Sequence, residues 1–436
     1  MATPSFRSIV SGFVLLVASP SHAQTESLRT LALEVLRTNP DIAAQDSATR
    51  ALQARVRGAR GGYFPSIIGS GLVERRRINV MNGGPGDAQF TAKQADIEAR
   101  LTLFDGLQTR NTVRVRQAEL GAGRAVQAAT TADTLLALLT AVADLRRDQQ
   151  VLLYAQRQYD SIGNELRGTR RRLQFGEATR TDTDQATARL AASAAGLLAA
   201  KGQVEESATA LAAVLGRRVA SLPPVAPLSG VPLSSDEAQA AALRANPLVE
   251  AARQSAEGAR QAVRVAKGAL LPVIEGVGGY EYLAGGVANI FTGALPNDRS
   301  AVFGGVQARI PLFQGGREYA EISRTRAVAN QRRFQLDSAE REAIRAADTA
   351  WQRLAVASGT IGEARAAVAA NESAVAGVKR EALEGSRTLL DVLDAENELL
   401  ASQVALERAI RNDYVARAEV LQAMGRLTVE SIVEQR

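Results

Sequence analysis

Apolar residues recur every seven positions in two long stretches of the chain. The first series is Leu138, Leu145, Leu152, Tyr159, Leu166 and Leu173. The second series, shifted by 209 residues, is Ala347, Leu354, Ile361, Val368, Val375 and Ala382. Heptad spacing of this kind is typical of long helices that pack as a coiled coil. We therefore predict long helices at about 107–172 and 181–214, and again at about 316–382 and 388–424.

Shorter stretches alternate between apolar and polar residues. From Ala95 to Leu103 the odd positions are apolar, and the even positions between them are polar. Period-two alternation indicates strands with one apolar and one polar face. The predicted strands are at about 66–80 and 90–104, and at about 273–285 and 300–313. They are long enough for tilted membrane strands of about 9–11 residues, and a soluble sheet with one wet face is the alternative.

The second half of the chain repeats the first. Leu36-Arg37-Thr38-Asn39-Pro40 returns as Leu243-Arg244-Ala245-Asn246-Pro247, and Leu103-Phe104-Asp105-Gly106 returns as Leu312-Phe313-Gln314-Gly315. Matches in the same order along both halves indicate an internal duplication. We therefore divide the chain into a first repeat at 24–222, a proline-rich linker at 223–236, a second repeat at 237–428 and a C-terminal tail at 429–436.

The number of predicted strands limits how this chain could enter a membrane, because each chain has only four. They are too few to close a barrel, and an open sheet edge is not tolerated in lipid. If the strands enter a membrane, several copies of the chain must complete a barrel together. Three copies would supply twelve strands, which is an even number of the kind found in transmembrane barrels.

The N-terminal residues have the pattern of a secretory signal. Arg7 supplies a positive start, an apolar run extends from Ile9 to Ala18, and Ser21-His22-Ala23 offers small residues at the two positions that a signal peptidase recognises. We predict that residues 1–23 are a signal peptide. A buried N-terminal helix is the alternative interpretation.

The composition narrows the possible chemistry. The chain has no cysteine, and its single histidine, His22, lies in the predicted signal peptide. The mature chain therefore lacks the groups for Ser-His or Cys-His catalysis and for a metal site with histidine or cysteine ligands, although catalysis by carboxylates stays open. The net charge is +6, but aromatic residues make up only 4% and the arginines are scattered among acids, which favours a solvated helix surface over nucleic-acid binding. We expect no enzyme activity, no metal, no cofactor and no nucleic-acid partner.

One run of residues is very similar to a known motif. Gly385-Ser386-Arg387-Thr388-Leu389-Leu390-Asp391-Val392-Leu393-Asp394-Ala395-Glu396-Asn397 resembles the periplasmic helix-to-helix turn of the TolC family of bacterial outer-membrane efflux and secretion channels. Strand pairs that alternate with long helical hairpins, twice per chain, resemble the same family over nearly the whole mature chain. The resemblance implies a homotrimer in the lipid of the cell outer membrane, with the helical part in the periplasm.

The predicted fold class is therefore a mixed α and β membrane protein. Most of the chain forms long coiled-coil helices, and each chain adds four amphipathic transmembrane strands in two internal structural repeats. By the resemblance, three copies complete a 12-stranded barrel that continues as an α-helical tunnel.

The resemblance also implies a function and partners. The protein would be a passive exit duct that carries substrates from an inner-membrane pump, of the ABC or the proton-driven kind, and a periplasmic adaptor to the exterior. The cargo stays open between protein, by type I secretion, and small toxic compounds. The alternative function is a periplasmic coiled-coil adaptor of an efflux pump, against which the duplicated hairpin and the four strands speak.

Residues at the two helical turns take roles by the same resemblance. Asp391 and Asp394 would form the pore constriction of the closed channel. Arg387 would act as a gate latch by reaching Asp182 and Thr181 in the turn of the other repeat. Spacing alone supports a simpler interpretation, in which Asp391 and Asp394 are acids at a helix N-terminus next to a solvated Arg387.

The remaining turn residues are glycines and apolar side chains. The resemblance implies that an adaptor contacts the turns at Gly176 and Gly385. Some family members have a tyrosine in the latch at the position of Ala382, so the latch here differs. Leu173, Phe175 and Leu389 are interpreted as packing residues.

Overall fold

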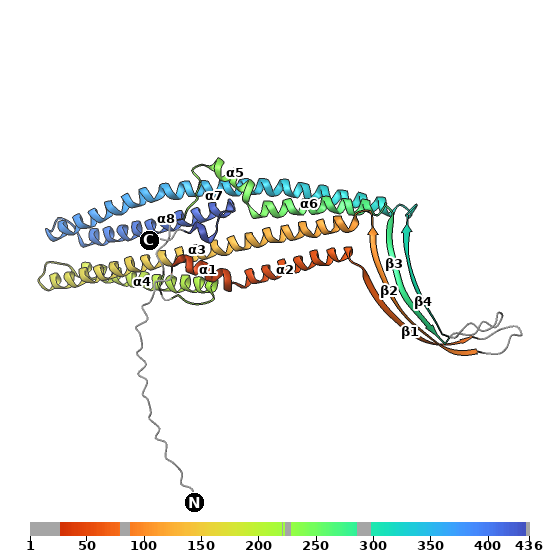
Figure 1. The fold of residues 1–436 in the computed structure, drawn as a ribbon. Coiled ribbons are helices and arrows are strands. Elements are labelled where there is room, and N and C mark those ends of the chain that lie inside the picture. The colour runs from red at the N-terminus through yellow and green to blue at the C-terminus, as the bar shows by residue number, and fades with distance from the viewer. Residues whose placement is uncertain (1–26, 79–87, 220, 223–227, 286–297, 433–436) are drawn as a thin grey trace, which may run out of the picture.

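The computed structural model describes residues 27–78, 88–219, 221–222, 228–285 and 298–432, and the predicted signal peptide at 1–23 lies outside them. Two long helical hairpins occupy one end of the molecule, and a curved four-stranded sheet occupies the other (Figure 1). The order helix, helix, strand, strand, helix, helix occurs twice along the described chain.

The hairpins consist of α3 (Gln108–Gln174) with α4 (Arg180–Leu215), and of α7 (Arg317–Leu383) with α8 (Leu389–Ala423). Helices α3 and α7 have 67 residues each, which corresponds to about 100 Å at about 1.5 Å per residue. Of the twelve heptad residues only Leu173 is exposed, and six are buried, namely Leu138, Leu145, Leu166, Ala347, Leu354 and Val375. The heptad series thus marks the faces on which the long helices pack.

Shorter helices precede each strand pair. They are α1 (Leu28–Thr38) and α2 (Pro40–Arg60), and α5 (Ser235–Ala245) and α6 (Pro247–Gly268). Asn39 and Asn246 separate the two helices of each pair, because their side-chain oxygens accept backbone N–H groups of the following helix, at 2.9 Å from Asp41 and 2.8 Å from Leu248. A proline then occupies the first helical position, where no N–H is needed. The sequence pattern did not predict α1 or α5, and α5 begins inside the predicted linker.

The sheet contains β1 (Ser66–Ile78), β2 (Ala88–Phe104), β3 (Val273–Ala284) and β4 (Asp298–Arg309). Its order is β1-β2-β3-β4 and all neighbours are antiparallel. The central pairing of β2 with β3 joins the two halves of the chain. Strand β4 ends at Arg309 instead of about 313, because Pro311 has no N–H with which to continue the ladder.

The register separates an apolar face from a polar face. Ile97 of β2 lies opposite Tyr280 of β3, and Tyr280 lies opposite Val302 of β4. Directly opposed residues point to the same face, so these three side chains form an apolar row, and they are 55%, 45% and 84% exposed. The neighbouring row points the other way and brings Asp96 opposite Glu281.

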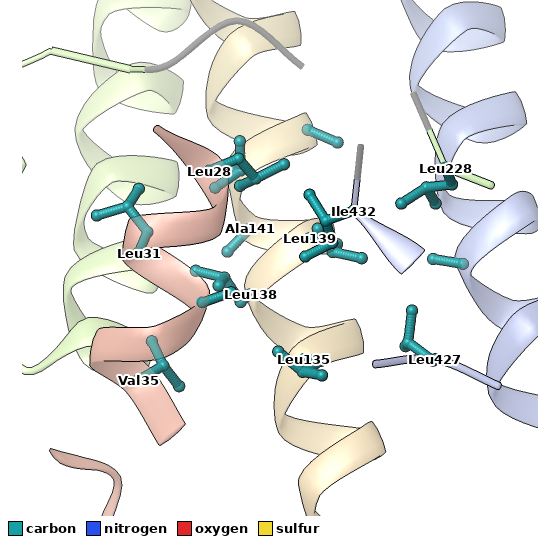
Figure 2. Packing of buried hydrophobic residues seen from close by; sticks show 14 of the residues in the cluster. Leu28, Leu31, Val35, Leu135, Leu138, Leu139, Ala141, Leu228, Leu427 and Ile432 are labelled. Atoms are coloured by element: carbon teal, nitrogen blue, oxygen red, sulfur yellow. The ribbon is translucent and has the colours of Figure 1, made fainter. Parts of the chain in front are cut away.

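The main hydrophobic core lies around α1, midway along the helical part (Figure 1), and joins both repeats (Figure 2). Its members include Leu28, Leu31 and Val35 of α1, Leu135, Leu138 and Leu139 of α3, and Leu421, Leu427 and Ile432 near the C-terminal end. The predicted tail at 429–436 is therefore not a tail in its described part. It forms the short helix η2 (Val429–Ser431), after which Ile432 pairs with Leu228 in an antiparallel bridge.

One stretch of α3 is long and apolar enough to cross a membrane by length and composition alone, and 44% of it is buried inside the molecule. Leu135, Leu138 and Leu139 of this helix are fully buried in the main core. We therefore interpret the stretch as a core helix.

The position of Ile432 in the core generates a stability prediction. Ile432→Ala should lower the free energy of unfolding by about 2–5 kcal/mol, because the side chain is 2% exposed and its removal leaves a cavity. Leu233→Ala is the matched control, since Leu233 is 93% exposed and should change the value by less than about 0.5 kcal/mol. Denaturant unfolding followed by the helical circular dichroism signal would measure both, and equal effects would contradict the assignment of the C-terminal segment to the core.

Candidate functional site

The α3–α4 turn and the α7–α8 turn lie at the same end of the molecule, away from the sheet (Figure 1). Each turn ends a helix with a left-handed glycine, Gly176 at φ +77° and Gly385 at φ +78°. The N–H of Glu177 donates to the carbonyl of Arg172 at 2.8 Å, and Ser386 makes the equivalent bond in the second turn, as in a Schellman motif. A Cβ at either glycine would meet no atom within 4 Å. Glycine is therefore needed here for its positive φ, and not because a side chain would lack room.

The helix after each turn begins with the same reciprocal cap. In the first turn, Thr179 Oγ1 accepts from the Asp182 N–H at 3.1 Å, and the Thr179 N–H donates to Asp182 Oδ2 at 2.8 Å. Thr388 and Asp391 form the matching pair at 3.3 and 2.9 Å. These capping boxes satisfy two backbone donors that the first helical turn otherwise leaves open. Asp182 and Asp391 are thus structural acids of the turns, whatever else they do.

The same bonds lower the pKa of both carboxyls. For Asp391 the largest cause is the backbone N–H of Thr388, followed by the Thr388 hydroxyl and, with a smaller effect, the positive charge of Arg387. For Asp182 the order is the backbone N–H and hydroxyl of Thr179 and then the charge of Arg172. Hydrogen bonds to the charged form favour ionisation, so both groups stay negatively charged in neutral and mildly acidic solution.

Arg387 binds an acid of its own hairpin. Its Nε donates to Glu381 Oε2 at 2.9 Å. Asp182 is held by Thr179, and Thr181 is exposed. The structure of a single chain therefore does not bring Arg387 to the two residues predicted as its latch partners.

Asp394 makes a contact between the repeats that the sequence pattern did not predict. Arg189 Nη2 of α4 donates to Asp394 Oδ1 of α8 at 2.8 Å. Both side chains are partly exposed, at 39% and 55%. Asp394 is thus neutralised by a neighbouring hairpin, whereas Asp391 faces the turn with only local partners.

A second inter-repeat contact lies close to the first and is centred on a buried carboxylate, while its lysine is 36% exposed. Lys379 Nζ of α7 lies 2.6 Å from Glu396 Oε1 of α8, and the same carboxylate oxygen accepts from Ser161 Oγ of α3. Lys379 also donates to Ser161 at 3.0 Å. Glu396 is only 6% exposed, and its other oxygen, Oε2, has no hydrogen-bond partner.

The sequence contains a signal for this contact. Lys379 follows Val375 by four residues and precedes Ala382 by three, which places a charged residue on the face of the helix that carries the heptad series. A polar residue at such a position commonly fixes how helices align. Arg189 offers no comparable signal, because its contact depends on how α4 is rotated toward α8.

Large apolar side chains are exposed beside both turns. Phe175 is 79% exposed and Leu383 is 82% exposed. The interpretation of Phe175 as a packing residue is therefore wrong for the single chain, and Leu173 is also 36% exposed. Exposed aromatic and leucine side chains at a protruding tip are typical of a surface that another protein covers.

The described residues contain no group of three or more His, Cys, Asp or Glu side chains placed to hold a metal ion. The arrangement of the turns is instead a set of helix ends, acids and arginines at the tip of a long helical structure. Its exposed apolar groups suit contacts between proteins.

Comparisons with known proteins agree with this architecture. Residues 31–217 and 239–426 each match the family model described as outer membrane efflux protein. The chain is 29% identical to the outer membrane efflux protein BepC of Brucella suis biovar 1 (strain 1330), over 98% of this chain and 92% of that protein. It is 21% identical to the outer membrane protein TolC of Escherichia coli (strain K12), over 95% of this chain and 85% of that protein.

A solved structure shares the fold. The outer membrane protein VceC of Vibrio cholerae superposes with a TM-score of 0.78 at 21% identity, covering 91% of this chain and 96% of that one. The two family matches together span most of the sequence, and the resemblance to the TolC family is confirmed. The chain belongs to the outer membrane efflux protein family.

Proposed function

We propose that three copies of this chain form a passive duct through which substrates leave the cell. Family membership makes it an outer-membrane protein whose helical part lies in the periplasm. The observation that carries the proposal is the sheet, which has an apolar face, a polar face and two open edges in the described chain.

The two edges are β1 and β4, each of which has a neighbour on one side only. They have 13 and 12 residues, and in lipid their free N–H and C=O groups would each cost several kcal/mol if left unpaired. Pairing β4 of one copy with β1 of the next satisfies both edges. Repeating this contact three times closes a barrel of twelve strands.

The faces of the sheet then have clear assignments. The row with Ile97, Tyr280 and Val302 faces lipid, and the row with Asp96 and Glu281 faces the lumen. Two acids directly opposite each other repel, and a water-filled lumen weakens this repulsion far more than a packed interior would. The helices continue the barrel as a tunnel toward the two turns.

The tip is the proposed site of partner contact and gating. Phe175 and Leu383 offer apolar surface beside Gly176 and Gly385, where we propose that a periplasmic adaptor binds and links the duct to an inner-membrane pump. The adaptor function itself is not favoured for this chain, because it has two hairpins and a four-stranded sheet that matches outer-membrane channels.

Asp391 and Asp394 are proposed to narrow the closed pore with negative charge. Three copies would bring six carboxylates around one axis, which attracts cations and repels anions. The bond of Asp394 to Arg189 makes Asp391 the stronger contributor. Because Arg387 binds Glu381 within its own copy, we propose that the latch to Asp182 and Thr181 forms between neighbouring copies, where the second hairpin of one meets the first hairpin of the next.

The cargo is proposed as small toxic compounds, since the relative BepC is named an efflux protein. Export of proteins by type I secretion is the second candidate, because the run from Arg387 to Asn397 resembles members that serve it. Both use the same duct.

Of the predictions that test the duct, the first concerns location and assembly. Membrane fractionation should find the protein in the outer membrane, and native mass spectrometry in detergent should give three times the mass of the mature chain. A freely soluble periplasmic pool, or a stable single-chain species in detergent, would contradict the duct.

The second prediction concerns the latch. Arg387→Ser and Asp182→Ala should each raise the conductance of the purified protein in planar bilayers, because each removes one side of the contact between copies. Arg380→Ser is the control, since Arg380 is exposed and its Nε donates to the Ala376 carbonyl of its own helix. Conductance that stays at the wild-type value in both variants would show that the latch is elsewhere, with the fold unaffected.

The third prediction concerns the acidic constriction. Asp391→Ala combined with Asp394→Ala should reduce block by multivalent cations, while Glu206→Ala, an exposed acid far along α4, should not. Since the pKa of Asp391 lies below its ordinary value of 3.8, the charge is present above that pH and is lost as the pH falls below it. The part of the block that Asp391 contributes should therefore be constant from pH 7 to about 5, and loss of block in the Asp394→Ala variant in that interval would assign it to other groups.

A further inference from the structure

We infer that the outer end of the sheet binds the phosphate groups of lipopolysaccharide, the phosphorylated glycolipid of the outer leaflet, through a cationic patch made of Lys93, Arg75 and Arg77. The inference rests on the proposed duct, because it takes the face with Ile97 and Tyr280 as the one that meets lipid. It adds a lipid partner, which is distinct from the neighbouring copies, the adaptor and the pump.

The strand register places the three cations on the lipid-facing side. Lys93 and Ile97 of β2 are four residues apart, so both side chains point to the same side of the sheet. Lys93 lies opposite Val73 of β1, and Arg75 and Arg77 follow Val73 at intervals of two, so they share that side. All three cationic residues are exposed.

Charge is confined to one end of this face. Within the four described strands, the lipid-facing positions carry four charged residues, which are the three cations of the patch and Asp298. Asp298 shares the row of Lys93 but lies two strands away from it. The residues opposite the two arginines are Thr91 and Gln89, which are neutral and able to hydrogen-bond sugar hydroxyls. The patch is therefore net positive and suits an anionic partner.

The patch lies at the end of the sheet away from the helices. Strand β1 begins at Ser66, soon after the short helix η1 (Gly61–Tyr63), and runs away from the helical part, so Arg75 and Arg77 lie near its far end (Figure 1). Because the helical part lies in the periplasm, the far end of the sheet lies on the external side of the membrane. The lipid that meets the patch is that of the outer leaflet.

The rows between the helices and the patch have the height of a membrane. The lipid-facing residues of β2 are apolar from Leu103 to Ala95, a separation of eight residues that corresponds to about 27 Å at about 3.4 Å per residue. The tilt of the strand reduces this height, and the apolar band of transmembrane barrels is about 25 Å tall. Lys93 is the next lipid-facing residue beyond Ala95, so the patch begins where the hydrocarbon ends.

The spacing of the cations favours a glycolipid over a phospholipid. Lys93, Arg75 and Arg77 occupy successive rows of the sheet, at intervals of about 7 Å along the strand. The polar layer of a phospholipid bilayer is only about 5–7 Å deep on each side, which is too thin for all three rows. Lipopolysaccharide carries phosphates on its lipid-bearing sugars and on the sugars above them, and thus presents phosphate at several heights. Arginine binds such groups through two N–H donors, and lysine binds them as a point charge.

The orientation of these side chains gives the contact its energetic basis. Lys and Arg turned toward hydrocarbon are unfavourable, whereas their long stems allow the charge to reach the head-group level. Clusters of such residues at a membrane surface bind anionic head groups. The patch thus fixes the outer edge of the sheet at the level of the phosphates.

A triple variant tests the patch. Lys93→Gln, Arg75→Gln and Arg77→Gln together should weaken binding of purified deep-rough lipopolysaccharide to the detergent-solubilised trimer by about tenfold to a hundredfold, because three ionic contacts are lost. Microscale thermophoresis measures the dissociation constant, and native mass spectrometry reports the mass of the trimer and the number of bound glycolipids.

The matched control removes the same charge from the other face. Arg100, Arg299 and Arg309 lie at positions of the sheet that alternate with the lipid-facing ones and point to the lumen. Changing these three arginines to glutamine together should leave lipopolysaccharide binding at the wild-type value. An equal loss in both triple variants would mean that net charge decides the binding, and would overturn the patch.

The choice of ligand separates the sources of phosphate. Lipopolysaccharide from which the phosphates have been removed should bind the wild type as weakly as the intact glycolipid binds the triple variant. Vesicles with phosphatidylglycerol should compete only weakly, and inorganic phosphate should not compete. Equal affinity for phosphatidylglycerol and lipopolysaccharide would overturn the assignment to the glycolipid.

The outcomes also separate the patch from the duct. Wild-type affinity in the triple variant, or a wild-type trimer of the expected mass that binds no lipopolysaccharide, would overturn the patch and leave the duct intact. If the triple variant does not assemble, Lys93→Gln alone should weaken binding and Lys93→Arg should retain it, and equal binding by both would overturn the patch. A wild-type protein that forms no trimer would count against the duct itself.

Discussion

The pairing of backbone groups along the two sheet edges is the constraint on which the rest of the structure depends. One chain offers four strands, with β1 and β4 at the edges, and lipid supplies no donor or acceptor to satisfy them. In the proposed duct, a closed ring of copies satisfies both edges. Because the central pair, β2 and β3, comes from different halves of the chain, each copy contributes two hairpins of strands and, below them, two hairpins of helices. Duplication of the chain and the proposed assembly both supply hydrogen-bonding neighbours for these strands.

Much of the fold can be read from periodicity, because the long elements repeat their pattern many times. Heptads mark α3 and α7, and alternation marks β2, where apolar residues from Ala95 to Leu103 share one face. Periodicity does not predict the short helices α1 and α5, because each has only eleven residues and therefore few apolar positions to form a pattern. The position of Ile432 is not predicted for another reason. Its partner Leu228 lies about two hundred residues away, and a local sequence pattern does not indicate contacts between such distant residues.

The site divides in the same way. Glycine followed by Thr-x-x-Asp encodes both the left-handed turn and the capping box, so the geometry around Gly176 and Gly385 follows from local sequence. The resemblance drew attention to Asp391, Asp394 and Arg387, and the structure adds what holds each of them. The contact of Arg189 with Asp394 forms only when the two helices have a particular rotation about their axes. The pattern of apolar residues defines this rotation only roughly, so it does not predict the partner of a single arginine. Lys379 is predictable only in part. The sequence shows a charged residue on the packing face of its helix, but only the structure identifies Glu396 as its partner.

The core that joins the N-terminal helix to the last described residues has a consequence for biogenesis. Leu28 and Leu31 near the start pack in the same cluster as Leu427 and Ile432 near the end, so this layer cannot be completed until nearly the whole polypeptide is present. Contacts between distant parts of a sequence form slowly, and until they form the helices of one half lack their partners from the other. In the proposed three-copy duct, this late-forming layer would delay association of a copy until both of its strand pairs have been made.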